Sequence, residues 1–134
     1  MEESLLAQVL AGGEYVTAER GETVYSPHHF RRSLALLLQG RIQVRRESLL
    51  VSTLGPGDLF GAAALFTGKE DYPTTLTALT HCRLLFISQE GVRQLIRRSG
   101  AFAEAYVTYL SGRIQFLSDR LDTVSAGGGE GELA

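Results

Sequence analysis

Short apolar runs separated by turn residues fill the chain between residues 15 and 88. Val, Ile, Leu and Tyr recur there at every second position or in unbroken stretches, and glycine punctuates them, which is the pattern of β-strands joined by tight turns. The pattern predicts an all-β core. The expected strands are Tyr15–Glu19, Thr23–Ser26, Ser33–Gln39, Arg41–Arg46, Ser48–Leu54, Thr74–Thr80 and Arg83–Ile87.

The segment Arg41–Arg46 has the clearest alternation. Its polar residues alternate with Ile42 and Val44, so one face of the strand is expected to be exposed to solvent and the other to be buried in the core. Gly40 precedes the segment and can adopt a positive φ in a tight turn. We therefore predict a hairpin that joins this strand to Ser33–Gln39.

Three helices are predicted around the strands. Capping serines followed by apolar residues at helical spacing place helices over residues 4–12 and 88–99. A third helix begins at about Phe102. These elements together predict a mainly β fold with flanking helices.

The third helix carries an apolar stripe with a spacing of three and four residues. This is an a/d repeat of about two and a half heptads, and charged residues flank it. The repeat predicts a dimerisation helix over residues 101–125, and packing of the stripe on the chain's own core is the alternative. The stripe consists of Val107, Leu110, Ile114, Leu117, Leu121 and Val124.

Composition and charge limit the classes of function that the chain can have. The 134 residues have the length of one domain, and 13 basic against 15 acidic side chains give a formal net charge of −2. This near-neutrality argues against DNA binding by these residues alone. The N-terminus does not read as an export signal, and no apolar run is long enough to cross a bilayer. We expect a soluble, cytoplasmic protein that does not bind membranes.

Few residues offer catalytic or metal chemistry. The single cysteine, Cys82, excludes a disulfide framework and an iron–sulfur cluster held by this chain's thiolates, and we expect it to be a buried structural thiol. His28 and His29 are adjacent and His81 is isolated, which is not the spacing of a metal site on a β-barrel. We expect no metal centre, no cofactor and no enzymatic activity.

Four segments, together with the long helix that follows them, resemble the cyclic-nucleotide-binding-domain fold of the Crp/Fnr superfamily of bacterial transcription regulators. They are Leu36–Val44, the turn Leu54–Gly61, Ala78–Ser88 and Gly91–Ile96. The resemblance implies a β-roll, that is, a jelly-roll-like double-stranded β-helix. In this reading, residues 1–100 form an effector-sensing roll with flanking short helices, 101–125 the dimerisation helix, and 126–134 a hinge.

The resemblance also implies where an effector binds. Nucleotide-binding members carry a ribose-binding glutamate directly after the turn glycine and a phosphate-binding arginine further on. Ala62 and Tyr72 stand at these positions here, so an effector other than cyclic AMP, of unidentified nature, is expected. Side chains that merely fill the roll are the alternative. The candidate ligand-binding residues are Gly61, Ala62, Ala63, Tyr72, Pro73, Thr74 and Thr75.

The expected function is therefore that of an effector-sensing and dimerisation domain of a Crp/Fnr-type transcription regulator. Its partners would be a second copy of the chain, a small-molecule effector, and DNA contacted only through a downstream helix-turn-helix domain that this chain lacks. The glycine-rich residues 126–134 are read as the hinge to that domain. A stand-alone cyclic-nucleotide-binding module that acts on a protein partner is the alternative.

Overall fold

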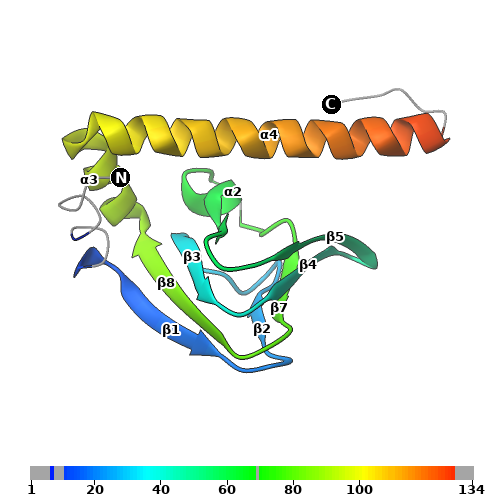
Figure 1. The fold of residues 1–134 in the computed structure, drawn as a ribbon, viewed down its shortest axis with the longest axis horizontal. Coiled ribbons are helices and arrows are strands. Elements are labelled where there is room, and N and C mark those ends of the chain that lie inside the picture. Colours follow the sequence, from blue (N-terminus) through cyan, green and yellow to red (C-terminus); the bar gives the residue numbers. More distant parts are fainter. Residues whose placement is uncertain (1–6, 8–10, 69, 129–134) are drawn as a thin grey trace. The chain divides into compact units, whose positions relative to one another are not determined.

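The computed structural model describes residues 7, 11–68 and 70–128, with the side chains up to residue 121. The chain forms two compact units, residues 1–95 and 96–134. The elements of the first unit are drawn in Figure 1. In order they are β1 (Glu14–Ala18), β2 (Thr23–Tyr25), β3 (Ser33–Gln39), β4 (Ile42–Arg46), β5 (Leu49–Leu54), β6 (Leu59–Phe60), α2 (Ala62–Leu65), β7 (Thr75–Ala78), β8 (Cys82–Ser88) and the start of α3 (Gln89–Arg98).

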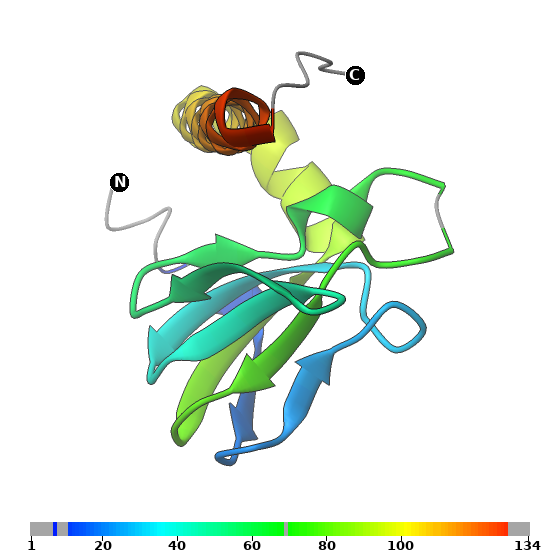
Figure 2. The same cartoon turned by 90° about the vertical axis from the view of Figure 1, so that its right-hand side faces the viewer.

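The strands form two four-stranded antiparallel sheets. One sheet has the order β1-β8-β3-β6 and the other β2-β7-β4-β5. The strands wrap around a common interior, as Figure 2 shows. Each of the seven predicted strands is present within one or two residues at its ends, and the two-residue strand β6 is an addition within the predicted turn Leu54–Gly61. The mainly β roll expected from the sequence is thus confirmed.

The predicted hairpin between residues 33–39 and 41–46 is wrong. β3 pairs with β6 and β8, whereas β4 pairs with β5 and β7, so the turn between β3 and β4 carries the chain from one sheet to the other. Gly40 does adopt the expected positive φ, of 100°. A side chain at this position would also collide with the carbonyl oxygen of His81, so the turn is packed against the start of β8.

The core lies between the two sheets. Side chains that alternate along the strands meet there, because successive residues of a strand point to opposite faces. Leu37, Ile42 and Leu84 are fully buried in this interior. On the other face of the first sheet, Leu34, Leu85 and Ile87 are buried as well. Both faces of β8 are therefore covered, which explains its nearly continuous apolar sequence.

The helices differ from their predicted bounds mainly at the C-terminus. Ala7, Ala11 and Gly12 are helical, and the rest of the helix predicted over 4–12, including its cap Ser4, lies outside the described residues. The second unit contains α4 (Gly100–Gly128), which begins two residues before Phe102. Residues 126–128, predicted as the start of the hinge, are helical, and 129–134 lie outside the described residues. No helix within the described part of the chain is long and apolar enough to span a membrane.

Candidate functional site

The turn that begins α2 is built on a glycine that no other residue could replace without strain. Gly61 ends β6 and caps α2 with a φ of 94°, in the left-handed region. A Cβ atom at this position would collide with the carbonyl oxygen of Ser33 on β3. The turn therefore lies directly against the first sheet, and the Gly61 N–H points into the roll rather than to solvent.

Tyr72 binds this turn from the loop between α2 and β7. Its hydroxyl accepts a hydrogen bond from the Gly61 N–H at 3.1 Å, and its side chain is only 5% exposed. The backbone N–H of Tyr72 in turn donates to the carbonyl oxygen of Pro27 at 3.0 Å. The donor that a helix N-terminus offers to an anion is thus used by a neutral phenol of the same chain.

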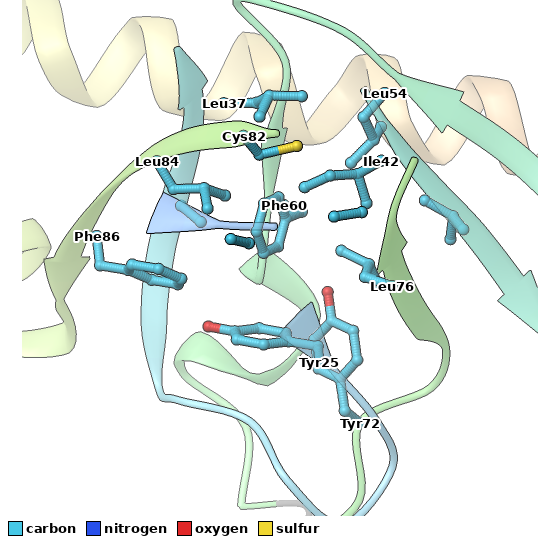
Figure 3. Close-up of a cluster of buried hydrophobic side chains, with 14 of the residues drawn as sticks. Tyr25, Leu37, Ile42, Leu54, Phe60, Tyr72, Leu76, Cys82, Leu84 and Phe86 are labelled. Atoms are coloured by element: carbon cyan, nitrogen blue, oxygen red, sulfur yellow. The ribbon is translucent and has the colours of Figure 1, made fainter. Parts of the chain in front are cut away.

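Tyr72 belongs to a cluster of aromatic rings at one end of the core. Its ring meets Tyr25 nearly at right angles, with centroids 4.9 Å apart, and lies 5.6 Å from Phe30. Tyr25 also makes an edge contact with Phe60 at 5.2 Å. Figure 3 shows Tyr25 and Tyr72 side by side, at the opposite end of the cluster from Leu37 and Leu54. These edge contacts add to the stability gained by burying the rings.

Tyr25 is the most enclosed member of the aromatic cluster. Its side chain is 1% exposed and its hydroxyl donates to the carbonyl oxygen of Arg31 at 3.1 Å. Burial raises the pKa of Tyr25 far above its usual value, and the nearby Tyr72 raises it further. Tyr25 is consequently a neutral donor near neutral pH, and it ties β2 to the loop ahead of β3.

The C-terminal end of α2 is fixed by two side chains from other elements. Arg32 donates from Nη1 to the carbonyl oxygens of Ala64 (2.7 Å) and Thr67 (3.2 Å). Gln89, the first residue of α3, donates from Nε2 to the carbonyl oxygen of Leu65 at 2.6 Å. A cation at a helix C-terminus is favourable, so α2 is held at both ends although it has a single turn.

The seven predicted ligand-binding residues fall into two groups. Gly61 and Tyr72 are buried and bonded to each other. The other five lie near the surface: Ala62, Thr74 and Thr75 are half-buried, and Ala63 and Pro73 are exposed.

An open cavity of about 450 Å³ lies elsewhere in the roll, and none of these seven residues lines it. It opens between β1, the outer strand of one sheet, and β2, the outer strand of the other. Its lining comes from β1, β2, β8 and the loop after β2, and it comprises Val16, Thr17, Ala18, Glu22, Thr23, Val24, Tyr25, His28, His29, Phe30, Arg31, Leu84 and Phe86.

Sequence reasoning missed this cavity for a physical reason. It forms where the outer strands of two different sheets fail to pair, and strand propensity does not tell which strands pair. The only sequence signal is the run of three polar residues and Phe30 at His28–Arg31, next to strand ends, which was read as a loop.

The histidines and the cysteine do not come together. His28 lies 3.8 Å from Asp71. His81, in the turn between β7 and β8, lies 3.0 Å from Glu19, in the turn between β1 and β2. Among the described residues, no three His, Cys, Asp or Glu side chains are grouped as a metal ion would require. Cys82 is fully buried and its thiol lies 3.4 Å from the carbonyl oxygens of Arg41 and Thr80, which confirms it as a buried thiol.

Several solved structures have a fold similar to that of this chain. The catabolite activator protein of Thermus thermophilus aligns with a TM-score of 0.81 at 22% identity, over 93% of this chain and 61% of that one. A transcriptional regulator from Thermotoga maritima aligns with a TM-score of 0.78 at 17% identity, over 94% of this chain and 99% of that one. The sensor domain of the transcriptional regulator DNR from Pseudomonas aeruginosa aligns at 0.70 and 20% identity, over 91% and 83%.

These identities show a shared fold. The chain spans about three fifths of the length of the Thermus thermophilus protein. No curated protein sequence matches it significantly. The family model described as the cyclic nucleotide-binding domain matches residues 15–99, which is more than half of the chain and includes every strand except the first residue of β1. The chain therefore belongs to the cyclic nucleotide-binding domain family.

Proposed function

We propose that this chain is the effector-sensing and dimerisation part of a Crp/Fnr-type transcription regulator whose effector is not a cyclic nucleotide. The observation that carries the proposal is the hydrogen bond between the Tyr72 hydroxyl and the Gly61 N–H at the start of α2. DNA would be contacted through a helix-turn-helix domain that follows α4. The fold supports the class of protein, and the replacement of the phosphate-binding arginine by Tyr72 supports the change of effector.

Binding a cyclic phosphate at α2 would require the roll to give up existing contacts. Tyr72 would have to leave the Gly61 N–H and its edge contact with Tyr25. No arginine would replace it, and a charge-assisted hydrogen bond is worth about 1.5 to 3 kcal/mol. Asp71, which is exposed beside Tyr72, would repel the phosphate instead.

The predicted ligand-binding residues take two roles in this proposal. Gly61 and Tyr72 hold the turn closed, and a change in the position of Tyr72 is the signal that α2 receives. The half-buried Thr74 and Thr75 follow Tyr72 and Pro73 in the chain, and they carry hydroxyls that can orient a small organic molecule. Ala62, Ala63 and Pro73 complete that surface.

Calorimetric titration with cyclic AMP and cyclic GMP tests the change of effector. We expect dissociation constants weaker than about 100 µM for both nucleotides, because the charge-assisted contacts are missing. A sub-micromolar constant for either one would contradict the proposal. The double variant Ala62→Glu with Tyr72→Arg restores the family's two side chains, and we expect it to bind cyclic AMP more tightly than the natural chain when circular dichroism confirms that it is folded.

The dimerisation part of the proposal rests on α4. Four apolar side chains of its stripe are exposed in the single chain, with Ile114 the most exposed at 67%, and Leu110 is half-buried. Exposed apolar residues at a/d spacing are what a second helix would cover. The four are Val107, Ile114, Leu117 and Leu121, while the side chain of Val124 lies outside the described residues.

A charge in the stripe tests the dimer. Leu117→Asp would place a carboxylate in the helix–helix contact, so we expect a monomer by light scattering and an unchanged roll by circular dichroism. Thr108→Asp is the matched control, because Thr108 is exposed on the same helix and off the stripe. A Leu117→Asp protein that remains a dimer would refute this part of the proposal.

A further inference from the structure

We propose that the cavity between β1 and β2 binds a small organic acid with a flat apolar body, an aromatic carboxylate being the simplest such ligand. This deepens the proposed function, on which it rests in one respect: it names the chemical class and the place of an effector that is not a nucleotide. A volume of about 450 Å³ is within the range of small-molecule sites.

The floor of the cavity is apolar and partly aromatic. Leu84 and Phe86 of β8 form it together with Tyr25, Phe30 and Val16. Leu84, Tyr25 and Phe86 have almost no exposed surface, so packing fixes their positions, whereas Val16, Val24 and Phe30 are half-buried. A flat apolar body would lie against the surface that these three half-buried side chains leave exposed.

The rim supplies cationic and hydrogen-bonding groups. The Arg31 guanidinium lies 4.5 Å from the centroid of the Phe86 ring, which holds it over the floor. Its Nη1 atom donates to the Glu14 carboxylate at 2.9 Å, an exposed pair of the kind that adds little stability. A ligand carboxylate can take the place of Glu14, and its apolar body then faces the cavity. His28 and His29 stand at the same rim.

The remaining charge in the lining does not compete for this position. Glu22 is the acid of the lining, and its carboxylate accepts a hydrogen bond from the backbone N–H of Glu19 within the turn between β1 and β2. It is therefore engaged at the turn, whereas Arg31 lies in the loop that leads to β3. The cation on the loop side of the cavity is Arg31, which is paired with Glu14, and Asp71 lies 3.8 Å from His28.

Backbone groups also face the cavity. Three consecutive residues of β1 (16–18) and three of β2 (23–25) line it. Side chains of consecutive strand residues point to opposite faces, so such a lining means that the strand edges themselves border the opening. Among the described residues, β1 pairs with β8 alone and β2 with β7 alone, so these residues leave N–H and C=O groups on the strand edges that border the cavity.

A ligand in this cavity would touch the residues that hold Tyr72. Tyr25 and Phe30 line the cavity, and both rings contact the ring of Tyr72. Tyr72 in turn binds the N-terminus of α2. Displacement of either ring by a ligand would thus be transmitted to α2 through packed side chains, without any ligand entering the turn at Gly61.

Titration of the full chain with naphthoate, using naphthylmethanol as the neutral analogue, tests the proposal. We expect naphthoate to bind roughly tenfold more tightly than the alcohol, because only the acid pairs with Arg31. Arg31→Gln should abolish that difference and leave the weak binding of the alcohol unchanged. Arg83→Gln is the matched control, because Arg83 is exposed on β8 next to Leu84 and does not line the cavity.

Each result decides the proposal. Equal affinities for acid and alcohol, or full naphthoate affinity in Arg31→Gln, would overturn the carboxylate site, and so would the absence of naphthoate binding at millimolar concentration. Circular dichroism of Arg31→Gln guards against loss of the fold. Tight cyclic AMP binding would refute the proposed function alone, because a naphthoate signal at the residues of the cavity is measured separately by NMR.

Discussion

The roll has two places where a ligand could meet it, and they are built in opposite ways. At the α2 turn, the Gly61 N–H is already bonded to Tyr72, and none of the seven predicted ligand-binding residues lines the cavity between β1 and β2. At the opening between β1 and β2, two strand edges stay unpaired with each other and a cavity of about 450 Å³ remains. At the position predicted from the family the backbone N–H is bonded within the chain, and the cavity lies at a position that sequence motifs do not mark.

The same aromatic cluster borders both the α2 turn and the cavity between β1 and β2. Tyr72 extends from it toward the turn, and Tyr25, Phe30 and Phe86 form the floor of the opening. A tyrosine in place of an arginine contributes an apolar ring to the core and a hydroxyl to the turn at once. Four predictions test the contrast between the two places.

Removing the ring of Tyr25 should disturb the packing at both places and should lower the unfolding free energy more than the other substitutions. Tyr25→Ala deletes a side chain that is 1% exposed and touches four other rings of the core. We expect a loss of about 3 to 5 kcal/mol in the free energy of unfolding, measured with a chemical denaturant. A loss below about 1 kcal/mol would mean that the cluster is loosely packed and that the contrast between the two places is wrong.

Two glycines with the same φ angle distinguish the free-energy cost of backbone strain from the cost of a steric collision at the α2 turn. Gly57 and Gly61 both have a φ of 94°, but a Cβ on Gly57 would meet nothing within 4 Å, whereas one on Gly61 would collide with the Ser33 carbonyl oxygen. We expect Gly57→Ala to cost about 1 kcal/mol and Gly61→Ala about 3 kcal/mol in unfolding free energy. Equal losses would show that the turn is not pressed against β3.

Alkaline pH should weaken the cluster in a predictable direction. The pKa of Tyr25 is raised in the folded chain, so its contribution to stability is complete below the unfolded-state pKa of about 10 and is lost as the pH rises above it. The unfolding free energy should fall there by up to about 1.4 kcal/mol per pH unit for this group. Burial also raises the pKa of Tyr106, so a smaller slope remains in Tyr25→Phe.

The control for this titration is Tyr15→Phe, at a tyrosine that is 54% exposed on β1. Comparison of the two variants shows whether the pH slope comes from the aromatic cluster or from outside it. A Tyr25→Phe protein with the full slope would place the alkaline sensitivity outside the aromatic cluster.

The smallest effect is expected from the hydroxyl of Tyr72. Tyr72→Phe keeps the ring and its contacts but leaves the Gly61 N–H without its acceptor, which should cost about 1 kcal/mol of unfolding free energy. Faster hydrogen exchange of the Gly61 amide should accompany the loss. If stability and exchange are both unchanged, the hydrogen bond is not what closes the turn.

Much of the fold follows from the sequence, because alternating and continuous apolar runs locate strands such as β3 and β8 without knowledge of their partners. Which strands pair does not follow from these runs. The sequence predicts a hairpin at Gly40, whereas in the structure the chain passes there from one sheet to the other. The seven candidate ligand-binding residues were predicted from the resemblance. That Tyr72 points inward to Gly61 could not be predicted, since it depends on the space between Tyr25 and Phe30. The cavity depends on two outer strands that do not pair, which no local pattern encodes.

The most direct test of the central claim follows the Gly61 amide by NMR during a titration with cyclic AMP. The account predicts that this resonance stays in place at nucleotide concentrations up to about 1 mM, because Tyr72 already occupies its N–H. A saturating shift of the Gly61 resonance at micromolar cyclic AMP would contradict the account, because it would mean that a nucleotide displaces Tyr72 from the turn.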